Sequence, residues 1–248
     1  AAADAAKAAE GYVPASMDEV SEPFLYSLSE HNWIWGYDMT ADLAMENPYA
    51  TSSAWIRSFS GDGYSAGTQV YSCINRLLYD RIPESDVRKG WWVDASLKSP
   101  LLEHVTWDGV SGDAVAGLTI DNVKMAFLPY TNVKFGMNTV GGTLNDDDWP
   151  FMRVEEMILI QIEGLAKSGS PAQAKDMLED FIRTYRDPAY SADAAGRSLE
   201  DEIWFQRRVE LWGEGFSNND TRRLNKPLVR FHGGEESNVP EAFRFNMT

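Results

Sequence analysis

The segment G-Y-S-A-G at residues 63–67 has the spacing of a hydrolase nucleophile. It matches the G-x-S-x-G pattern, with Ser65 in the place of the nucleophile. His232 follows downstream with aspartates between, so the chain order Ser, Asp, His of a serine hydrolase is available. That motif requires a buried strand directly before the serine, whereas residues 58–62 are mostly polar and turn-like. We therefore assign no catalytic residue and keep a serine hydrolase using Ser65 as an alternative function.

Residues that could bind a metal are scattered along the chain. The acidic run Asn145 to Asp148 offers oxygen atoms to calcium, but it lacks the spacing, the glycine and the glutamate of an EF-hand loop. His31 and His104 have no partner at ligand spacing, and Cys73 is the single cysteine. We expect no metal and no cofactor; a solvated acidic loop is the expected state of residues 146–148, and calcium there is left open.

Aromatic side chains in polar surroundings give the best indication of a binding function. Sugar rings stack their C–H faces on tryptophan and tyrosine, while sugar hydroxyls need polar partners. The polar stretch 39–68 and the tryptophan pair after Lys89 supply such side chains. The candidate ligand-binding residues are Tyr49, Trp55, Arg57, Tyr64, Trp91 and Trp92. Trp33 and Trp35 lie in a strand-like run, and we expect both in the core.

Charge and length narrow the class of protein. The chain has 248 residues, a formal net charge of -16 and a pI of about 4.5. Such a surface repels phosphate, so we expect no nucleic acid partner, and anionic lipid is disfavoured for the same reason. Neutral ligands such as sugars or peptides remain open. No apolar run approaches the roughly 20 residues of a membrane span, and the alanine-rich residues 1–10 are typical of a helix interior, as in a fragment of a longer protein.

The first 147 residues predict short elements and a long irregular excursion. A helix is expected over residues 2–10, ended by Gly11, and a second over 17–28. A strand is expected over 32–38, and a helix over 68–79. Residues 39–147 as a whole are rich in loops, and long loops in a domain commonly carry function.

The last third predicts amphipathic helices. Apolar residues at helical spacing predict one helix over 151–167. Ser170, with Pro171 and Gln173 after it, predicts a capping box at the start of the next helix. Ser198 is expected to cap a third helix, residues 199–212. Two helices joined by so short a turn have the length of a tetratricopeptide-like hairpin.

The residues of these helices resemble the SusD/RagB family. The run 148–159, D-W-P-F-M-R-V-E-E-M-I-L, is similar to the family's R-x-x-E-x-x-L helix, and residues 181–186, F-I-R-T-Y-R, to the end of its next helix. The run 206–215, Q-R-R-V-E-L-W-G-E-G, resembles E-R-R-x-E-L-x-x-E-G, and residues 220–223 match D-L-x-R. Residues 148–223 therefore carry the motifs that define the family.

Weaker matches extend the resemblance over most of the chain. Residues 32–36 resemble the family's E-I-I-W strand, and residues 86–88 resemble its D-x-R element. Gln206 and Ser217 depart from the pattern, and we expect each to weaken one ion pair. The family's A-E-A sequence is I-E-G here at 162–164, so only the glutamate is kept. Family members are about twice this length, so we expect residues 1–248 to be a single domain that forms a C-terminal half.

The charged residues of the motifs lie on helices with apolar faces. Burying them singly would cost several kcal/mol each, whereas pairs between helices would hold the helices in register. We therefore expect a structural role, with no ligand contact. The structural motif residues are Arg153, Glu156, Arg207, Arg208, Glu210, Glu214, Asp220 and Arg223.

The resemblance implies a mainly α fold and a binding function without catalysis. The expected fold is SusD-like, with tetratricopeptide-type helical hairpins, long loop excursions and few short strands. The resemblance implies a cell-surface lipoprotein of the outer membrane, whose anchor is not within this chain. It would bind a nutrient, by expectation an oligosaccharide, and pass it to a SusC-like TonB-dependent transporter. A peptide-binding or adhesive surface protein is the further alternative.

Overall fold

A computed structural model describes the chain over most of its helical part and over shorter stretches elsewhere. The described residues are 1–22, 31–40, 42–43, 72–96, 98–102, 129–135, 148–229 and 246–247. The α-helices there are α1 (Ala2–Ala8), α2 (Met17–Val20), α6 (Arg76–Tyr79), α8 (Val154–Lys167), α9 (Pro171–Tyr185), α10 (Leu199–Glu210) and α11 (Phe216–Arg223). The 3-10 helices are η1 (Val87–Trp91) and η2 (Pro100–Leu102), and the strands are β1 (Trp33–Tyr37), β2 (Trp149–Arg153), β3 (Leu228–Val229) and β4 (Asn246–Met247).

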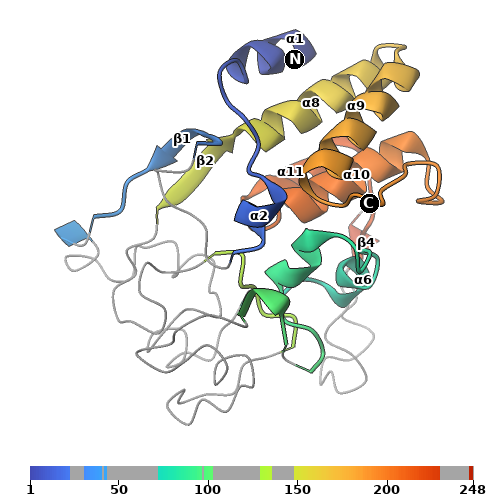
Figure 1. The fold of residues 1–248 in the computed structure, drawn as a ribbon. Coiled ribbons are helices and arrows are strands. Elements are labelled where there is room, and N and C mark those ends of the chain that lie inside the picture. Colours follow the sequence, from blue (N-terminus) through green and yellow to red (C-terminus); the bar gives the residue numbers. More distant parts are fainter. Residues whose placement is uncertain are drawn as a thin grey trace.

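The helices α8 and α9 form a hairpin, with α10 packed against both and α1 against α8 (Figure 1). Apolar residues repeat on the inner faces of these helices, which makes the tetratricopeptide-like packing favourable. Leu159 and Ile162 of α8 meet Leu178 and Ile182 of α9, and all four side chains are buried. This cluster is the core of the helical scaffold, and the mainly α fold is as predicted.

A second core lies between α10 and the segments that precede β2 in sequence. Phe205 and Val209 of α10 pack with Leu78, Ile82 and Trp92 from the 72–102 segment. Helix α10 therefore has apolar contacts on two sides. The α8–α9 hairpin packs on one side, and the loop-rich segment packs on the other. This arrangement holds the irregular part of the chain against the scaffold without a large sheet.

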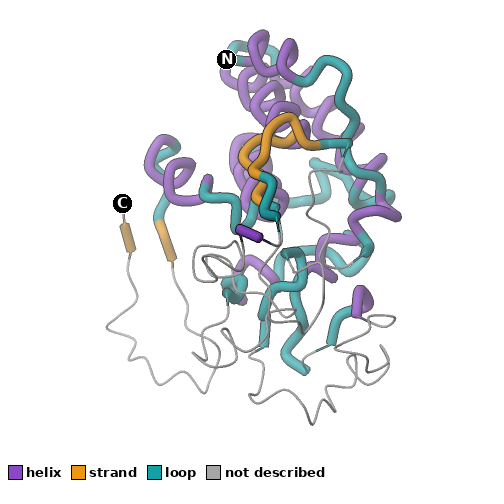
Figure 2. The backbone as a smooth tube through the Cα atoms, turned by 90° about the vertical axis from the view of Figure 1, so that its left-hand side faces the viewer, coloured by secondary structure: helices purple, strands orange, loops and turns teal. Residues whose placement is uncertain are grey.

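Two-stranded antiparallel pairs complete the described fold. β1 pairs with β2, and β3 pairs with β4 as a separate sheet (Figure 2). The predicted strand at 32–38 is confirmed as β1. The predicted helix start at Phe151 is wrong: residues 149–153 are strand, and α8 begins at Val154. Pairing with β1 occupies the backbone of these residues, and the Val154 amide donates to the Asn32 carbonyl at 2.9 Å.

Capping explains several helix boundaries. Ser198 accepts a hydrogen bond from the Asp201 amide and caps α10, as predicted. Ser170 makes no side-chain capping bond, so the predicted capping box is wrong there. A capping box does form at the start of α2, between Ser16 and Glu19.

Two predicted helices are shorter in the structure. The helix expected over 68–79 is confined to Arg76–Tyr79 within the described residues, because Asn75 caps it and Cys73 pairs with Thr131 as a β-bridge. The helix expected over 17–28 ends at Val20, and residues 23–30 lie outside the described part. Helix α1 matches the prediction closely, with Gly11 at φ +85° in the turn after it.

Candidate functional site

Glu210, at the last turn of α10, is at the centre of a buried ion network. Its carboxylate accepts from Arg186 at 2.8 and 2.9 Å, from Arg88 at 3.2 Å and from Arg153 at 3.4 Å. Burial alone would raise the pKa of Glu210, but the charges of Arg186, Arg153 and Arg88 outweigh it and hold the pKa far below its usual value. The network joins α9, α10, β2 and η1 at one point.

Glu214 extends the network toward the 129–135 segment. It accepts from Arg153 Nη2 at 2.7 Å and from Lys134 Nζ at 2.7 Å. Lys134 also donates to the carbonyls of Glu210 and Trp212, at 2.7 and 3.0 Å. Burial lowers the pKa of Lys134 to about 8, although the charge of Glu214 opposes the shift. All available donors of this buried ammonium face acceptors of the scaffold, so its role is structural.

The remaining motif charges differ in their surroundings. Arg207 pairs with Asp220 at 2.8 Å, and Arg223 contacts both Asp220 and Glu163. These contacts tie α11 to α10 and α8. Glu156 and Arg208 have no such ion pair within the described ranges. The structure thus places most of the motif in the interior, and its contribution to stability stays a prediction.

The exposed side of the β1–β2 pair carries four aromatic rings. Trp35, Tyr37 and Phe151 have exposed fractions of 62%, 45% and 40%, and Trp149 is half-buried. Trp35 and Phe151 meet edge to face with ring centroids 5.0 Å apart, and Trp149 lies 6.3 Å from Tyr37 and 6.4 Å from Phe151. We call these four residues the aromatic platform.

The position of Trp35 on this platform corrects the expectation that it lies in the core. Trp33 is buried as expected, but the pairing register shifts between Trp33 and Trp35 and again before Gly36. A bulge of this kind redirects side chains that strict alternation would place on one face. With two strands in the sheet, one face packs toward the scaffold and the other is open to solvent.

Trp91 and Trp92 lie in the core, so neither forms the exposed stacking surface expected of a ligand-binding tryptophan. Their exposed fractions are 2% and 0%. The Trp91 indole donates to the Val20 carbonyl at 3.0 Å, and its ring lies 4.7 Å from Lys134 Nζ. Trp92 packs edge to face on Trp212. Aromatic side chains commonly dominate protein cores. The polar residues near Trp91 and Trp92 in sequence gave no sign that both tryptophans are buried.

A groove of about 810 Å³ runs beside η1 and η2. Its lining includes Tyr79, Glu84, Lys89, Trp92 and Asp94. Burial, with the negative charges of Asp94 and Glu84, raises the pKa of Tyr79 to about 12. The hydroxyl therefore stays protonated, and the groove offers a hydroxyl donor together with carboxylate acceptors. Its size lies in the range of small-molecule sites, about 300–1,000 Å³.

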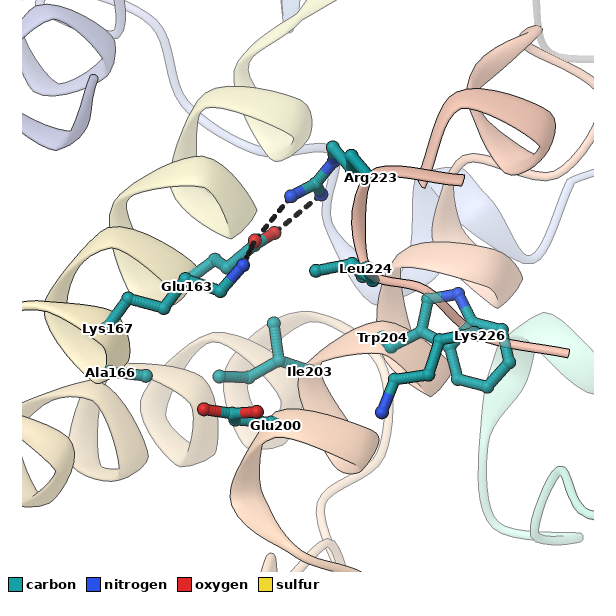
Figure 3. Close-up of a pocket in the computed structure, with 9 residues that line it drawn as sticks. All are labelled: Glu163, Ala166, Lys167, Glu200, Ile203, Trp204, Arg223, Leu224 and Lys226. Carbon is teal, nitrogen blue, oxygen red and sulfur yellow. Dashed lines mark hydrogen bonds and ion pairs between the residues drawn. The ribbon is translucent and has the colours of Figure 1, made fainter. Parts of the chain in front are cut away.

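A smaller pocket of about 170 Å³ opens between α8, α10 and the end of α11 (Figure 3). Glu163 lines it and is bound by Arg223 and Lys167. Ala166, Ile203 and Leu224 form its apolar part, and Trp204 forms one wall. The pocket is thus an apolar hollow with a charged rim.

Within the described residues, no cluster of three or more His, Cys, Asp or Glu side chains could hold a metal ion. His31 interacts with Glu19 and the Val13 carbonyl, and the Asp148 carboxylate accepts from the Met39 amide at 2.8 Å. Cys73 is half-buried, and burial raises the pKa of its thiol. The helices of the described part are all too short or too polar to cross a membrane.

Comparison of the sequence with family profiles decides the family. The profile of the SusD family matches residues 108–240, which is more than half of the chain. The chain belongs to the SusD family. Among curated proteins, none matches it significantly.

Solved structures of SusD-like proteins share the fold. A SusD-like carbohydrate binding protein from Bacteroides vulgatus ATCC 8482 has 22% identity and a TM-score of 0.62, over 99% of this chain and 46% of that one. A SusD superfamily protein from Bacteroides thetaiotaomicron VPI-5482 has 19% identity and a TM-score of 0.55, over 93% and 46%. Surface glycan-binding protein A from Bacteroides thetaiotaomicron, in complex with laminarihexaose, has 16% identity and a TM-score of 0.51, over 90% and 51%. This chain spans about half the length of these SusD-like structures.

The SusD motifs that are far apart in sequence meet in the ion network. In the D-x-R element, Asp86 and Arg88 form a bidentate pair, and Arg88 also donates to Gln206 at 2.6 Å. Gln206 donates in turn to Glu202 at 2.8 Å. Gln206, which replaces the family glutamate, therefore gives Arg88 a hydrogen bond in place of an ion pair. It also avoids a second carboxylate beside Glu202.

Several residues singled out in the sequence lie outside the described ranges. They are Tyr49, Trp55, Arg57, Tyr64, Ser65, His104, Asn145, Asp146, Asp147 and His232. Both the predicted loop aromatics and the alternative nucleophile therefore stay predictions. The platform has no signal in the sequence, because Tyr37, Trp149 and Phe151 precede or follow short polar runs and only strand pairing brings them together.

Proposed function

We propose that this SusD-family chain is part of a cell-surface protein that binds an oligosaccharide through exposed aromatic side chains. The observation that carries the proposal is the aromatic platform, in which Trp35, exposed to 62%, contacts Phe151, and Phe151 and Tyr37 each contact Trp149. A soluble protein seldom exposes so many neighbouring aromatic rings unless they bind something. Pyranose rings present apolar C–H faces that suit such a surface, while their hydroxyls stay hydrated.

The platform is well supported by the scaffold. At one end of the strand pair, Trp33 lies opposite Arg153, which is fixed by Glu210 and Glu214. At the other end, Tyr37 lies opposite Trp149. The rings thus lie on strands that are anchored at one end by the buried ion network. Little conformational entropy is therefore lost when a ligand binds.

The relatives support a saccharide as the ligand class. One solved relative is described as a carbohydrate binding protein, and another was solved with laminarihexaose. The loop residues Tyr49, Trp55, Arg57 and Tyr64 would extend the binding surface. The groove beside η1 offers hydroxyl and carboxylate partners for sugar hydroxyls. No catalytic step is part of this proposal.

We also propose a location and a transporter partner for the whole protein. The whole protein would be a lipoprotein of the outer membrane that passes its ligand to a SusC-like TonB-dependent transporter. The resemblance of the helix motifs to the SusD/RagB family supports this, since such proteins work with a transporter of that type. The helical scaffold would face the transporter, and the platform with the loops would face the ligand.

The test compares matched aromatic variants by affinity electrophoresis in gels that contain polysaccharides, followed by calorimetry with the oligosaccharide that retards the chain. Trp35→Ala is expected to weaken binding roughly tenfold, which corresponds to about 1.4 kcal/mol. Tyr12→Ala is the control, because Tyr12 is also an exposed aromatic residue (37%) in the turn after α1, and it has no ring contact with the platform within the described ranges. The melting temperature of both variants should match that of the parent chain.

Three outcomes would contradict the proposal. One is saccharide affinity that Trp35→Ala and Phe151→Ala leave unchanged. Another is labelling of the parent chain, but not of Ser65→Ala, by a fluorophosphonate probe, which would favour the serine hydrolase. The third is a chain that no polysaccharide retards, which would favour a peptide-binding or adhesive surface protein.

A further inference from the structure

The two stretches of sequence that contain the strands of the aromatic platform are rich in acidic residues and lack lysine and arginine. Residues 8–56, which include β1, contain eight Asp and Glu residues and no Lys or Arg. Residues 135–152, which include β2 up to its last residue, contain three Asp and no Glu, Lys or Arg. The whole chain has 22 Lys and Arg in 248 residues, so 67 residues of average composition would contain about six. The negative charge of the chain is therefore concentrated in sequence around the platform.

Asp38 and Asp148 bring this charge to one end of the platform. Asp38 directly follows Tyr37 at the end of β1, and Asp148 directly precedes Trp149 at the start of β2. Tyr37 and Trp149 are paired across the strands, and the Met39 amide donates to the Asp148 carboxylate at 2.8 Å. Consecutive Cα atoms are about 3.8 Å apart. Both carboxylates therefore lie within about one Debye length, ~8 Å at physiological salt, of the backbone of the Tyr37–Trp149 pair.

The basic side chains at the other end of the strand pair face carboxylates. His31 contacts Glu19 at 2.8 Å. Arg153 is buried and contacts three carboxylates, those of Glu155, Glu210 and Glu214. Charges that are paired in this way produce a weak field at a distance, because the contributions of opposite sign largely cancel. The two aspartates therefore dominate the field that a ligand meets at the Tyr37–Trp149 end of the platform.

We propose that Asp38 and Asp148 set the charge preference of the aromatic platform. A sugar that carries an amine binds there more tightly than its neutral counterpart, and a sugar that carries a carboxylate binds less tightly. An ammonium group is attracted both by the carboxylates and by the faces of tryptophan and tyrosine rings. A carboxylate or sulfate ester is repelled by the same carboxylates and by the negative ring faces.

This inference rests on the proposed function, because the sugar ring is bound by the platform itself. The aspartates form no site of their own; they decide which substituents the stacked sugar can carry. Two unit charges about 8 Å apart in water interact with an energy close to RT. Each carboxylate should therefore change the affinity for a singly charged sugar by a factor of about two, in opposite directions for an amine and a carboxylate.

The experiment measures the binding of the methyl β-glycosides of glucose, glucosamine and glucuronate to the full chain. These probes share one pyranose ring and differ in charge at neutral pH. Nuclear magnetic resonance titration of the tryptophan indole signals reports weak binding directly. At low salt the expected order of affinity is glucosaminide, glucoside, glucuronoside. Sodium chloride at about 1 M, where the Debye length is about 3 Å, should bring the three affinities together.

Asparagine variants remove the charges with little change in shape. Asp38→Asn and Asp148→Asn should each lower the ratio of glucosaminide to glucuronoside affinity about fourfold, because the two affinities change by about twofold in opposite directions. Asparagine at position 148 keeps a side-chain oxygen that can accept from the Met39 amide, so the melting temperature should stay close to that of the parent chain. A general loss of structure would lower both affinities and leave their ratio unchanged.

Asp176→Asn is the matched control. Asp176 is an exposed aspartate near the start of α9, which lies beside the end of α8 that is remote from β2 (Figure 1). Helix α8 has 14 residues, so at 1.5 Å per residue it places roughly 20 Å between that end and the strands. The affinity ratio of this variant should equal that of the parent chain.

The remaining outcomes overturn the inference. Equal affinities for the three glycosides at low salt would do so, as would an affinity ratio that Asp38→Asn and Asp176→Asn lower equally. Glucosaminide binding that Tyr37→Ala leaves unchanged would show that the aspartates attract any cation, such as a basic peptide, without the platform. No binding of any glycoside also overturns it, since two carboxylates should make at least the glucosaminide bind. The polysaccharide test of Trp35→Ala does not depend on ligand charge, so the proposed function and this inference can fail separately.

Discussion

Arg186 and Glu210 form a bidentate pair in the interior, where the end of α9 meets the last turn of α10. Arg186 Nε and Nη2 donate to the two carboxylate oxygens at 2.8 and 2.9 Å, and both side chains are completely buried. Arg186 also donates to the Ala15 carbonyl at 2.8 Å, which fixes the segment between α1 and α2. The pair thus connects parts of the chain that lie far apart in sequence.

We predict that Glu210→Gln lowers the free energy of unfolding by roughly 3–5 kcal/mol, because it leaves three buried guanidinium groups short of negative charge. Urea denaturation measures this directly. Glu10→Gln is the control, since Glu10 is exposed, and it should change stability by less than about 0.5 kcal/mol. Equal stability of the two variants would show that the network contributes specificity and not stability.

The buried carboxyl of Glu156 should give the stability of the folded state an unusual dependence on pH. Burial raises its pKa to about 7, with further upward contributions from Glu214 and Asp220 that Arg207 and Arg153 oppose. In the unfolded chain the pKa of a glutamate is about 4.3. Between these values the folded state binds more protons than the unfolded state, so this carboxyl favours folding at low pH and destabilises the fold as pH rises toward 7.

Glu156→Gln should therefore raise the melting temperature at pH 8 and have little effect near pH 4. The expected gain at pH 8 is on the order of 4 kcal/mol at most, from about 1.4 kcal/mol per unit of pKa shift. Differential scanning calorimetry of parent and variant across this range measures the difference, in which other titrating groups cancel. A gain that is constant with pH would mean that the pKa of this carboxyl is the same in the folded and unfolded states.

Gly164 is predicted to be required for the docking of α1 on α8. A Cβ at this position would lie 2.6 Å from the Cβ of Ala2, which is closer than two such carbons approach. Gly164→Ala should displace α1 and increase amide hydrogen exchange over residues 2–8. The double variant Ala2→Gly with Gly164→Ala should restore protection; if it does not, the loss comes from α8 itself. The contact also explains why glycine replaces the family alanine here.

The amphipathic pattern of the last third was sufficient to predict α8, α9 and α10, but it did not predict α11. Val154, Ile158 and Ile162 recur on one helix face, and local propensity with caps such as Ser198 defines most of the boundaries. The motif residues were sufficient to predict the SusD family and a mainly α fold. These features are local in sequence, so they need no knowledge of distant contacts.

Tertiary structure decided which side chains are exposed. Trp35 and Trp91 both lie in aromatic runs, yet one is 62% exposed and the other 2%. The difference depends on a bulge between two strands more than 100 residues apart, and on a helix carbonyl that accepts from the Trp91 indole. Neither the strand bulge nor the hydrogen bond to Trp91 can be recognised from the sequence next to the tryptophan concerned.

Tertiary structure also decided which charged side chains are paired. The sequence alone predicted that Arg207 and Arg208 share one helix of the family motif, but adjacent positions on a helix point about 100° apart. Arg207 turns inward to Asp220, whereas Arg208 turns to Trp204, where no carboxylate of the described ranges pairs with it. Only packing against α11 and the 72–102 segment decides which arginine is paired, because pairing depends on side chains contributed by distant parts of the chain.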